Sequence, residues 1–283
     1  MADRSQIEWT DATWNPVTGC SRVSRGCENC YAERLAATRL RHHPSRSGLA
    51  NHRTGRWTGK VSLNGQWLDQ PLRWTRPRKI FTVAHGDLFY EAVPAAWTDE
   101  VFAVMAMCPQ HTFQVLTKRP ARARSYIVQF DGDEAIERVA GAAVRIAGSP
   151  CAAGIIEDAT MVALPNVWLG VSVEDQPTAD ERIPVLLDTP AAVRWISAEP
   201  LLGPVEIDDF LEGIGWVVAG GESGPAARPM EPHWPRSIRN QCICAQVPFF
   251  FKQWGGPTAK AGGRELDGRT WDQTPPPRRP AGG

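Results

Sequence analysis

Short apolar runs recur along the chain and alternate with segments that have helical periodicity. The runs are Ile80–Ala84, Thr112–Leu116, Asn166–Val171, Val193–Ile196, Trp216–Ala219 and Phe249–Phe251. Helical spacing of apolar residues marks 33–40, 97–107, 178–187 and 233–244, and Thr178 with Glu181 has the pattern of a capping box. This alternation is typical of buried parallel strands joined by helices. With one more strand before residue 20, the pattern predicts about seven parallel strands in an α/β fold.

Each apolar run is followed by charged or hydrogen-bonding residues at its C-terminal end. These residues are Asp87, Lys118, Arg119, Ser172, Glu174, Glu199, Glu222, Ser223, Lys252 and Gln253. In a (β/α) barrel the C-terminal ends of all strands meet at one mouth, where active sites form. We therefore predict a (β/α) barrel, partial and with six or seven parallel strands, in preference to an open doubly wound sheet.

The domain organisation follows from length and from the places where the alternation breaks. Residues 1–257 are predicted to form a single barrel domain with insertions at about 41–79 and 130–165, and the proline-rich 258–283 is predicted to be a disordered tail. No apolar run reaches the roughly 18 residues of a membrane span, and the N-terminus lacks the apolar core of a signal peptide. We expect a cytoplasmic protein that has no membrane partner.

Three of the seven cysteines, Cys20, Cys27 and Cys30, lie within eleven residues directly after the first predicted strand. Clustered thiolates repel one another unless a cation or a disulfide takes up their charge, so the triplet indicates a metal site. A closed zinc site needs a fourth ligand, which only Cys242 or Cys244 would supply, whereas an iron-sulfur cube can keep one iron open. An open cluster fits best, with structural zinc and redox or incidental cysteines as the alternatives.

The net charge of zero hides an asymmetry between two parts of the chain. Residues 34–79 hold eleven Lys and Arg but one acid, Asp69, while 80–212 hold twenty acids and eight bases. Trp57, Trp67 and Trp74 lie inside the basic segment 34–79, where cations and rings together can bind a nucleic-acid backbone and stack on bases. The equal alternative is a solvated loop whose tryptophans pack onto the body of the protein.

Several sequence blocks resemble the phage Gp37/Gp68 family, a group of phage proteins with a three-cysteine motif. The blocks are IEWTDATWNP at 7–16, GCENCYAE at 26–33, GVSVE at 170–174, SAEPL at 197–201, GGESG at 220–224 and PFFFKQWG at 248–255. They span nearly the whole of the predicted barrel. This family name implies little about biochemistry.

The same arrangement distantly resembles the radical S-adenosylmethionine (SAM) enzymes, which are TIM-barrel relatives with three cysteines after the first strand. That resemblance implies a [4Fe-4S] cluster held by Cys20, Cys27 and Cys30, SAM bound at its open iron, and an electron donor as partner. It also implies cofactor contacts by Tyr31, by Gly86 and Asp87 at the methionine end, and by Ser172 or Glu174 at the ribose. In such enzymes the cofactor carries the chemistry, while the protein positions the substrate and excludes water.

The remaining charged residues at the predicted mouth are candidates for substrate binding or catalysis. We place Lys118, Glu199, Glu222 and Lys252 in this group, and their mixed charge suits a polar substrate with phosphate or carboxylate groups. The alternative for these side chains is a set of salt bridges that closes the mouth.

Three functions remain open from the sequence. The first is an iron-sulfur, SAM-dependent radical enzyme that acts on a nucleic acid or a nucleotide-like substrate. The second is a zinc-stabilised nucleic-acid-binding or nuclease-like phage protein, in which Asp87, Glu174, Glu199 and Glu222 bind divalent cations. The third is a non-catalytic scaffold for a protein partner.

Overall fold

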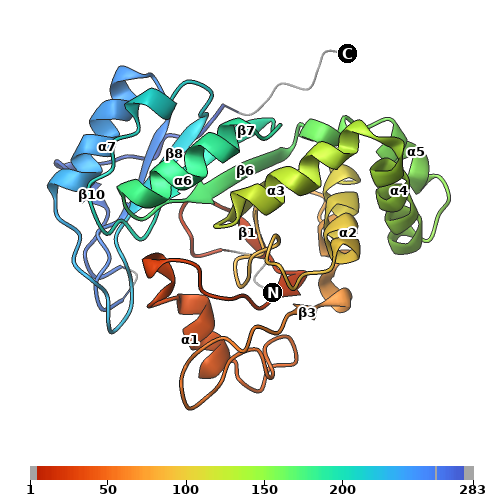
Figure 1. The fold of residues 1–283 in the computed structure, drawn as a ribbon, viewed down its shortest axis with the longest axis horizontal. Helices are drawn as coiled ribbons and strands as arrows, with labels where there is room; N and C mark the ends of the chain where they lie inside the picture. The colour runs from red at the N-terminus through yellow and green to blue at the C-terminus, as the bar shows by residue number, and fades with distance from the viewer. Residues whose placement is uncertain (1–4, 259, 277–283) are drawn as a thin grey trace.

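Seven parallel strands form one curled sheet, and the sheet follows the order of the chain (Figure 1). The computed structural model describes residues 5–258 and 260–276. The strands are β1 (Ala12–Trp14), β4 (Lys79–Thr82), β5 (Thr112–Thr117), β6 (Val167–Ser172), β7 (Val193–Ala198), β8 (Trp216–Gly220) and β9 (Phe249–Gln253). Neighbours pair in register, as in Ala12 with Ile80 and Trp195 with Trp216. The sheet is an open half-barrel, so the predicted fold class is confirmed.

Helices cover the convex face of the sheet. They are α2 (Ala95–Ala106), α3 (Pro120–Ile127), α4 (Asp133–Ala147), α5 (Ala152–Glu157), α6 (Gln176–Leu187) and α7 (His233–Cys244). The period of two along each strand sends Ile80, Val115 and Ile196 into the core that these helices share with the sheet. Among the described residues, no helix combines the length and the apolar character that crossing a membrane requires.

Tryptophans fill the concave face at the N-terminal half of the strands. Trp9, Trp168, Trp195 and Trp216 form a separate apolar cluster that contains no helix residue. The rings of Trp195 and Trp216 have centroids 5.2 Å apart. A Cβ on Gly170 would lie 2.4 Å from the indole of Trp195, so this strand position has room only for glycine. The cluster therefore fills the face of the sheet that the helices do not share.

The two predicted insertions have different structures. The first, 41–79, forms a lobe with α1 (Tyr31–Ala37) below the sheet in the view of Figure 1, and its strand β3 (Ser62–Leu63) pairs with β2 (Val17–Thr18). The second, 130–165, supplies α4 and α5, which pack beside α2 at the right of the same view. The first insertion therefore lies beside the segment that carries the cysteines.

The tail predicted to be disordered is ordered over its described part. Residues 265–270 form the hairpin of β10 (Glu265–Leu266) and β11 (Arg269–Thr270), and Leu266 and Trp271 are buried. Phe251 N donates a hydrogen bond to Trp271 O over 2.9 Å, so the segment covers the free edge of β9. The prediction of disorder is wrong for 260–276, because two apolar side chains and edge hydrogen bonds outweigh the Gly/Pro-rich composition. Residues 277–283 lie outside the described residues.

Candidate active site

The charged residues predicted at the mouth lie together there and form ion pairs. Lys118 at the end of β5 pairs with Glu174 after β6, and Lys252 in β9 pairs with Glu199 after β7. Asp87 after β4 lies 3.1 Å from Arg119, and Glu222 after β8 lies 2.6 Å from Arg228. The observed contacts therefore match the alternative interpretation of these residues, in which they form a set of salt bridges at the mouth.

The cysteine loop, residues 19–30, runs across the ends of β1 and β4. Gly19 has φ of +101° and forms a parallel bridge with Gly86, and a Cβ on Gly86 would lie 2.9 Å from Gly19 O. The loop continues through a one-turn 3-10 helix, Arg25–Cys27, and leads into α1 directly after Cys30. This route places all three predicted ligands near the strand ends.

The three thiols are free and close enough to affect one another's ionisation. Burial, followed by the charges of Asp87, Cys27 and Cys30, raises the pKa of Cys20 to about 12. Burial also raises the pKa of Cys30. A cation at this loop would favour the thiolates, which are the forms that bind metals.

Arg119 is a buried cation that contacts the cysteine loop. Its Nη1 lies 3.6 Å from Cys20 Sγ and 3.1 Å from Asp87 Oδ2, and its Nη2 donates to Ser21 O over 3.1 Å. The guanidinium also lies over the ring of Tyr90 at 4.7 Å. Its charge lowers the pKa of Cys20 against the effect of burial. The sequence placed Arg119 after a strand, but its contacts with Cys20 and Ser21 are apparent only in the folded structure.

Glu222 holds the same loop from the opposite side of the mouth. Its carboxylate accepts hydrogen bonds from Asn29 Nδ2 at 2.9 Å and from Arg228 Nε at 3.0 Å. Arg228 Nη1 in turn donates to Glu28 over 2.7 Å. Burial opposes ionisation of Glu222, but the hydrogen bonds from Arg228 and Asn29 outweigh it and lower the pKa of this carboxyl. Glu222 is therefore an ionised anchor for the segment between Cys27 and Cys30.

Glu33, which the sequence did not single out, connects the cysteine loop to the first insertion. Its carboxylate is buried and accepts hydrogen bonds from Arg22 Nε at 3.0 Å and from the backbone N of Trp57 at 2.7 Å. Glu33 follows Cys30 by three residues, so one acidic side chain links the metal-ligand candidates to the basic segment. Its position in the GCENCYAE block was the only sequence signal available.

The predicted cofactor residues differ in their access to the mouth. The side chain of Tyr31 is 43% exposed, although its hydroxyl donates to Ala84 O. Ser172 is buried, and its backbone O accepts a hydrogen bond from Arg182 Nη1 over 2.8 Å. Glu174 is 0% exposed, and Lys118 and Arg182 are its ion-pair partners. Glu174 thus has no free face toward solvent.

Glu174 also contacts the cysteine loop. An ideal Cβ on Gly26 would lie 2.4 Å from Glu174 Cγ and 2.6 Å from its Cδ. Real Cβ atoms do not approach this closely, and the ion pairs of Glu174 prevent it from moving away. The loop therefore needs glycine next to Cys27.

We expect Gly26→Ala to destabilise the protein by about 1–3 kcal/mol, the usual cost of overpacking a buried contact. Gly154→Ala is the matched control, since no atom lies within 4 Å of a Cβ placed at this position in helix α5. The control should be neutral or more stable by up to about 1 kcal/mol. Urea unfolding of both variants measures the difference, and equal midpoints would contradict the contact between Gly26 and Glu174.

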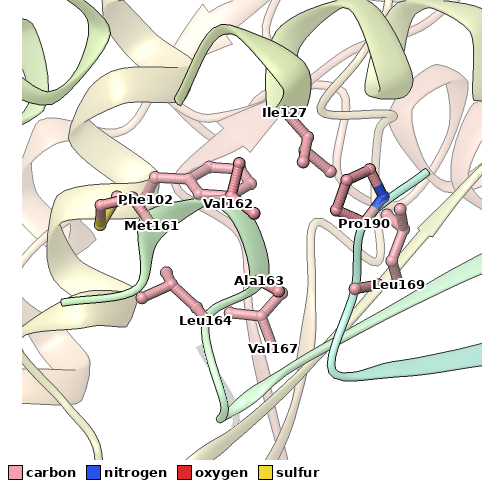
Figure 2. A pocket seen from close by; sticks show the side chains of 10 residues that line it. Phe102, Ile127, Met161, Val162, Ala163, Leu164, Val167, Leu169 and Pro190 are labelled. Carbon is pink, nitrogen blue, oxygen red and sulfur yellow. The ribbon is translucent and has the colours of Figure 1, made fainter. Parts of the chain in front are cut away.

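The remaining cysteines do not join the loop. Cys242 on α7 is buried in the core between the helix and the sheet, and Cys244 is exposed. No group of three or more described His, Cys, Asp or Glu residues is arranged to hold a metal ion. An apolar pocket lined by Phe102, Ile127 and Met161 lies away from the mouth, and its volume of about 10 Å³ has room for about one water (Figure 2).

The model of a family described as a protein of unknown function (DUF5131) matches residues 4–275. No curated protein and no solved structure matches the chain.

Proposed function

The chain belongs to the DUF5131 family, and we propose that it is an iron-sulfur, SAM-dependent radical enzyme that acts on a nucleic acid or a nucleotide-like polar substrate. The observation that carries this proposal is the position of the cysteine loop. Three free thiols within reach of one another's charge lie at the C-terminal mouth of a parallel half-barrel. Active sites of (β/α) barrels form at this end.

The donor set at the loop has the chemistry of a [4Fe-4S] site, although the three thiols are not arranged as a metal-holding group among the described residues. The loop would have to draw the thiols together around a cluster. Cys20, Cys27 and Cys30 would hold it, and the buried Arg119 supplies a cation and an N–H donor beside Cys20 Sγ. Positive charge and hydrogen bonds near cluster sulfurs are the means by which proteins tune such groups. When bound, the cluster would supply one electron to SAM, and a redox protein partner would return that electron.

The residues of the mouth divide into anchors and accessible groups. Arg119 and Glu222 position the cysteine loop by direct hydrogen bonds, and Asp87 holds Arg119. Lys118, Glu199 and Lys252 keep 17–19% of their side chains exposed, so they are the groups with access to a bound molecule. In this proposal these three contact the substrate, and Tyr31, Gly86, Asp87, Ser172 and Glu174 line or support the cofactor side.

The basic lobe supports a polyanionic substrate. Most of its Lys and Arg side chains are exposed, namely Arg34, Arg39, Arg41, Arg53, Arg56, Lys60, Arg73 and Arg76. Trp74 does not contribute a stacking surface, because it is buried and its ring faces Arg78 at 4.7 Å. Trp67 stacks on His43, with centroids 5.7 Å apart. The lobe would therefore bind through charge more than through these rings.

The nuclease-like alternative has less support. Each of the four carboxylates that would bind divalent cations, Asp87, Glu174, Glu199 and Glu222, has a Lys or Arg as partner. A metal ion would have to displace these bases. The scaffold alternative predicts a protein with no cofactor chemistry, which the following experiment separates from an enzyme.

The test is anaerobic reconstitution with iron and sulfide, followed by reduction in the presence of SAM. We expect brown protein with broad absorbance near 400 nm that bleaches on reduction, and formation of 5'-deoxyadenosine. A colourless protein that carries one tightly held zinc would overturn the proposal.

The binding of nucleic acid to the protein should weaken steeply with salt. Charge reversal at Arg53, Arg56, Arg76 and Arg78 should weaken nucleic-acid binding. Unchanged binding would contradict the proposal that the basic lobe holds a nucleic acid.

A further inference from the structure

Arg46 is a buried cation in the first insertion that has no acidic partner. The residue is 5% exposed. Its Nη1 donates to Ser45 O over 3.0 Å and to Ser45 Oγ over 2.8 Å, whereas its buried Nε has no hydrogen-bond partner. Within residues 5–258 and 260–276, no carboxylate forms an ion pair with its guanidinium. By contrast, an acid pairs with each of the two other buried arginines among the described residues, Arg119 and Arg182.

An unpaired buried charge is costly, and proteins rarely keep one without a function. Burial lowers the pKa of Arg46 to about 10, which still leaves the guanidinium charged at neutral pH. An anion from outside the chain would supply the missing negative charge and the missing acceptor.

Arg46 and His85 both connect to the start of the cysteine loop. Ser45 O accepts hydrogen bonds from Arg46 Nη1 and from Thr18 Oγ1, and Gly19 N donates to His85 O over 3.2 Å. The charge of Arg46 acts on His85 and on Tyr31, whose rings have centroids 5.7 Å apart. His85 Nδ1 is buried and has no hydrogen-bond partner. Burial lowers the pKa of His85 to about 4, so the ring is neutral at pH 7 and can donate one hydrogen bond. Two unsatisfied polar groups therefore lie on segments that contact the start of the cysteine loop.

We propose that Arg46 and His85 form a binding site for an oxyanion, and that the oxyanion is a phosphate group of the substrate. This inference deepens the proposed function, since it names the part of a nucleotide that the site would hold. Phosphate is favoured over carboxylate by the charge of the surrounding lobe. Eleven bases and one acid within 34–79 suit a chain of phosphates, whereas a lone carboxylate needs only one partner.

The experiment compares Arg46→Met with the parent and with Arg124→Met, an exposed arginine of α3 outside the basic lobe. Calorimetric titration with inorganic phosphate, and with sodium acetate at the same ionic strength, gives the affinities. We expect phosphate to bind the parent and Arg124→Met alike and to bind Arg46→Met at least tenfold more weakly. Equal phosphate affinity in all three proteins would overturn the site, and tighter binding of acetate would overturn the choice of phosphate.

A second measurement on the parent covers the case in which Arg46→Met does not fold. Phenylglyoxal modifies arginine, and mass spectrometry locates the modified residue. Phosphate should slow the modification of Arg46 but not of Arg124, and equal rates at Arg46 with and without phosphate would contradict the site. Both measurements are made on the full chain before and after cluster reconstitution. Phosphate binding by a protein that forms no cluster would refute the proposed function and leave this inference standing.

Discussion

Cys27→Ala is expected to abolish the bound iron and sulfide of the anaerobically reconstituted protein. The three thiols of the loop are the available ligands near the strand ends, and Cys242 is buried in a different part of the core, so no other thiol can replace Cys27. Loss of one of three ligands leaves a second iron of the cube without a protein ligand. Iron and sulfide analysis together with the absorbance near 400 nm measures the loss. The same variant should also lower the stability of the loop from Thr18 to Tyr31.

The matched controls are Cys108→Ala and Cys151→Ala. Cys108 is buried in the core and Cys151 is exposed before α5, so neither belongs to the cysteine loop. Both controls should retain the iron content of the parent. Parent-level iron in Cys27→Ala would contradict the assignment of the ligands, and iron loss in the controls would point to a general folding defect.

The local pattern of the sequence was sufficient to predict the strands, because burial on both faces demands apolar runs. All six runs became strands of one parallel sheet, and 233–244 is the helix α7. The prediction of where α6 begins was less accurate. Its N-cap is Asp175, and Thr178 is the N3 partner of that capping box, so the predicted cap at Thr178 is wrong. Asp accepts from the N3 backbone as well as Thr does, and pattern alone did not choose between them.

The partners of the charged residues could not be predicted from the sequence. Arg119 and Cys20 are separated by 99 positions, and Asn29 and Glu222 by 193. Nothing local distinguishes an arginine that supports the cysteine loop from one that contacts a substrate.

The ordered structure of the tail, 260–276, was missed for a related reason. Burial of Leu266 and Trp271 favours an ordered structure for this segment, although both residues lie in a stretch whose composition is typical of disorder.

The cysteine loop is fixed from three directions by ion-paired side chains that come from different strand ends. Arg119 contacts its beginning at Cys20 and Ser21, and Glu222 contacts Asn29 near its end. Glu174 lies against its middle at Gly26. Such support on rigid elements is what a site for a reactive cofactor needs, since a displacement of 1 Å can be costly. The loop should therefore be sensitive to substitutions that do not touch a cysteine.

Glu174→Leu is expected to cause the largest loss of stability among substitutions outside the cysteines. The carboxylate is fully buried and lies 3.1 Å from Arg182, which is 2% exposed. Its removal leaves Arg182 as a buried charge without an acid, and breaking such a pair from one side costs about 3–5 kcal/mol. Urea unfolding at pH 7 measures the cost. Reconstituted protein should also lose cluster content, because the contact at Gly26 is lost.

The double variant Glu174→Leu with Arg182→Met separates a buried-charge effect from a packing effect. If the cost comes from the uncompensated guanidinium, the double variant unfolds at a higher urea concentration than Glu174→Leu alone. Lys118 does not obscure this comparison, since 19% of its side chain is exposed and its ammonium can reach water. Additive losses in the two single variants would mean that the pair contributes no coupling. That result would make the cavity left by Glu174, rather than its charge, the cause of the destabilisation.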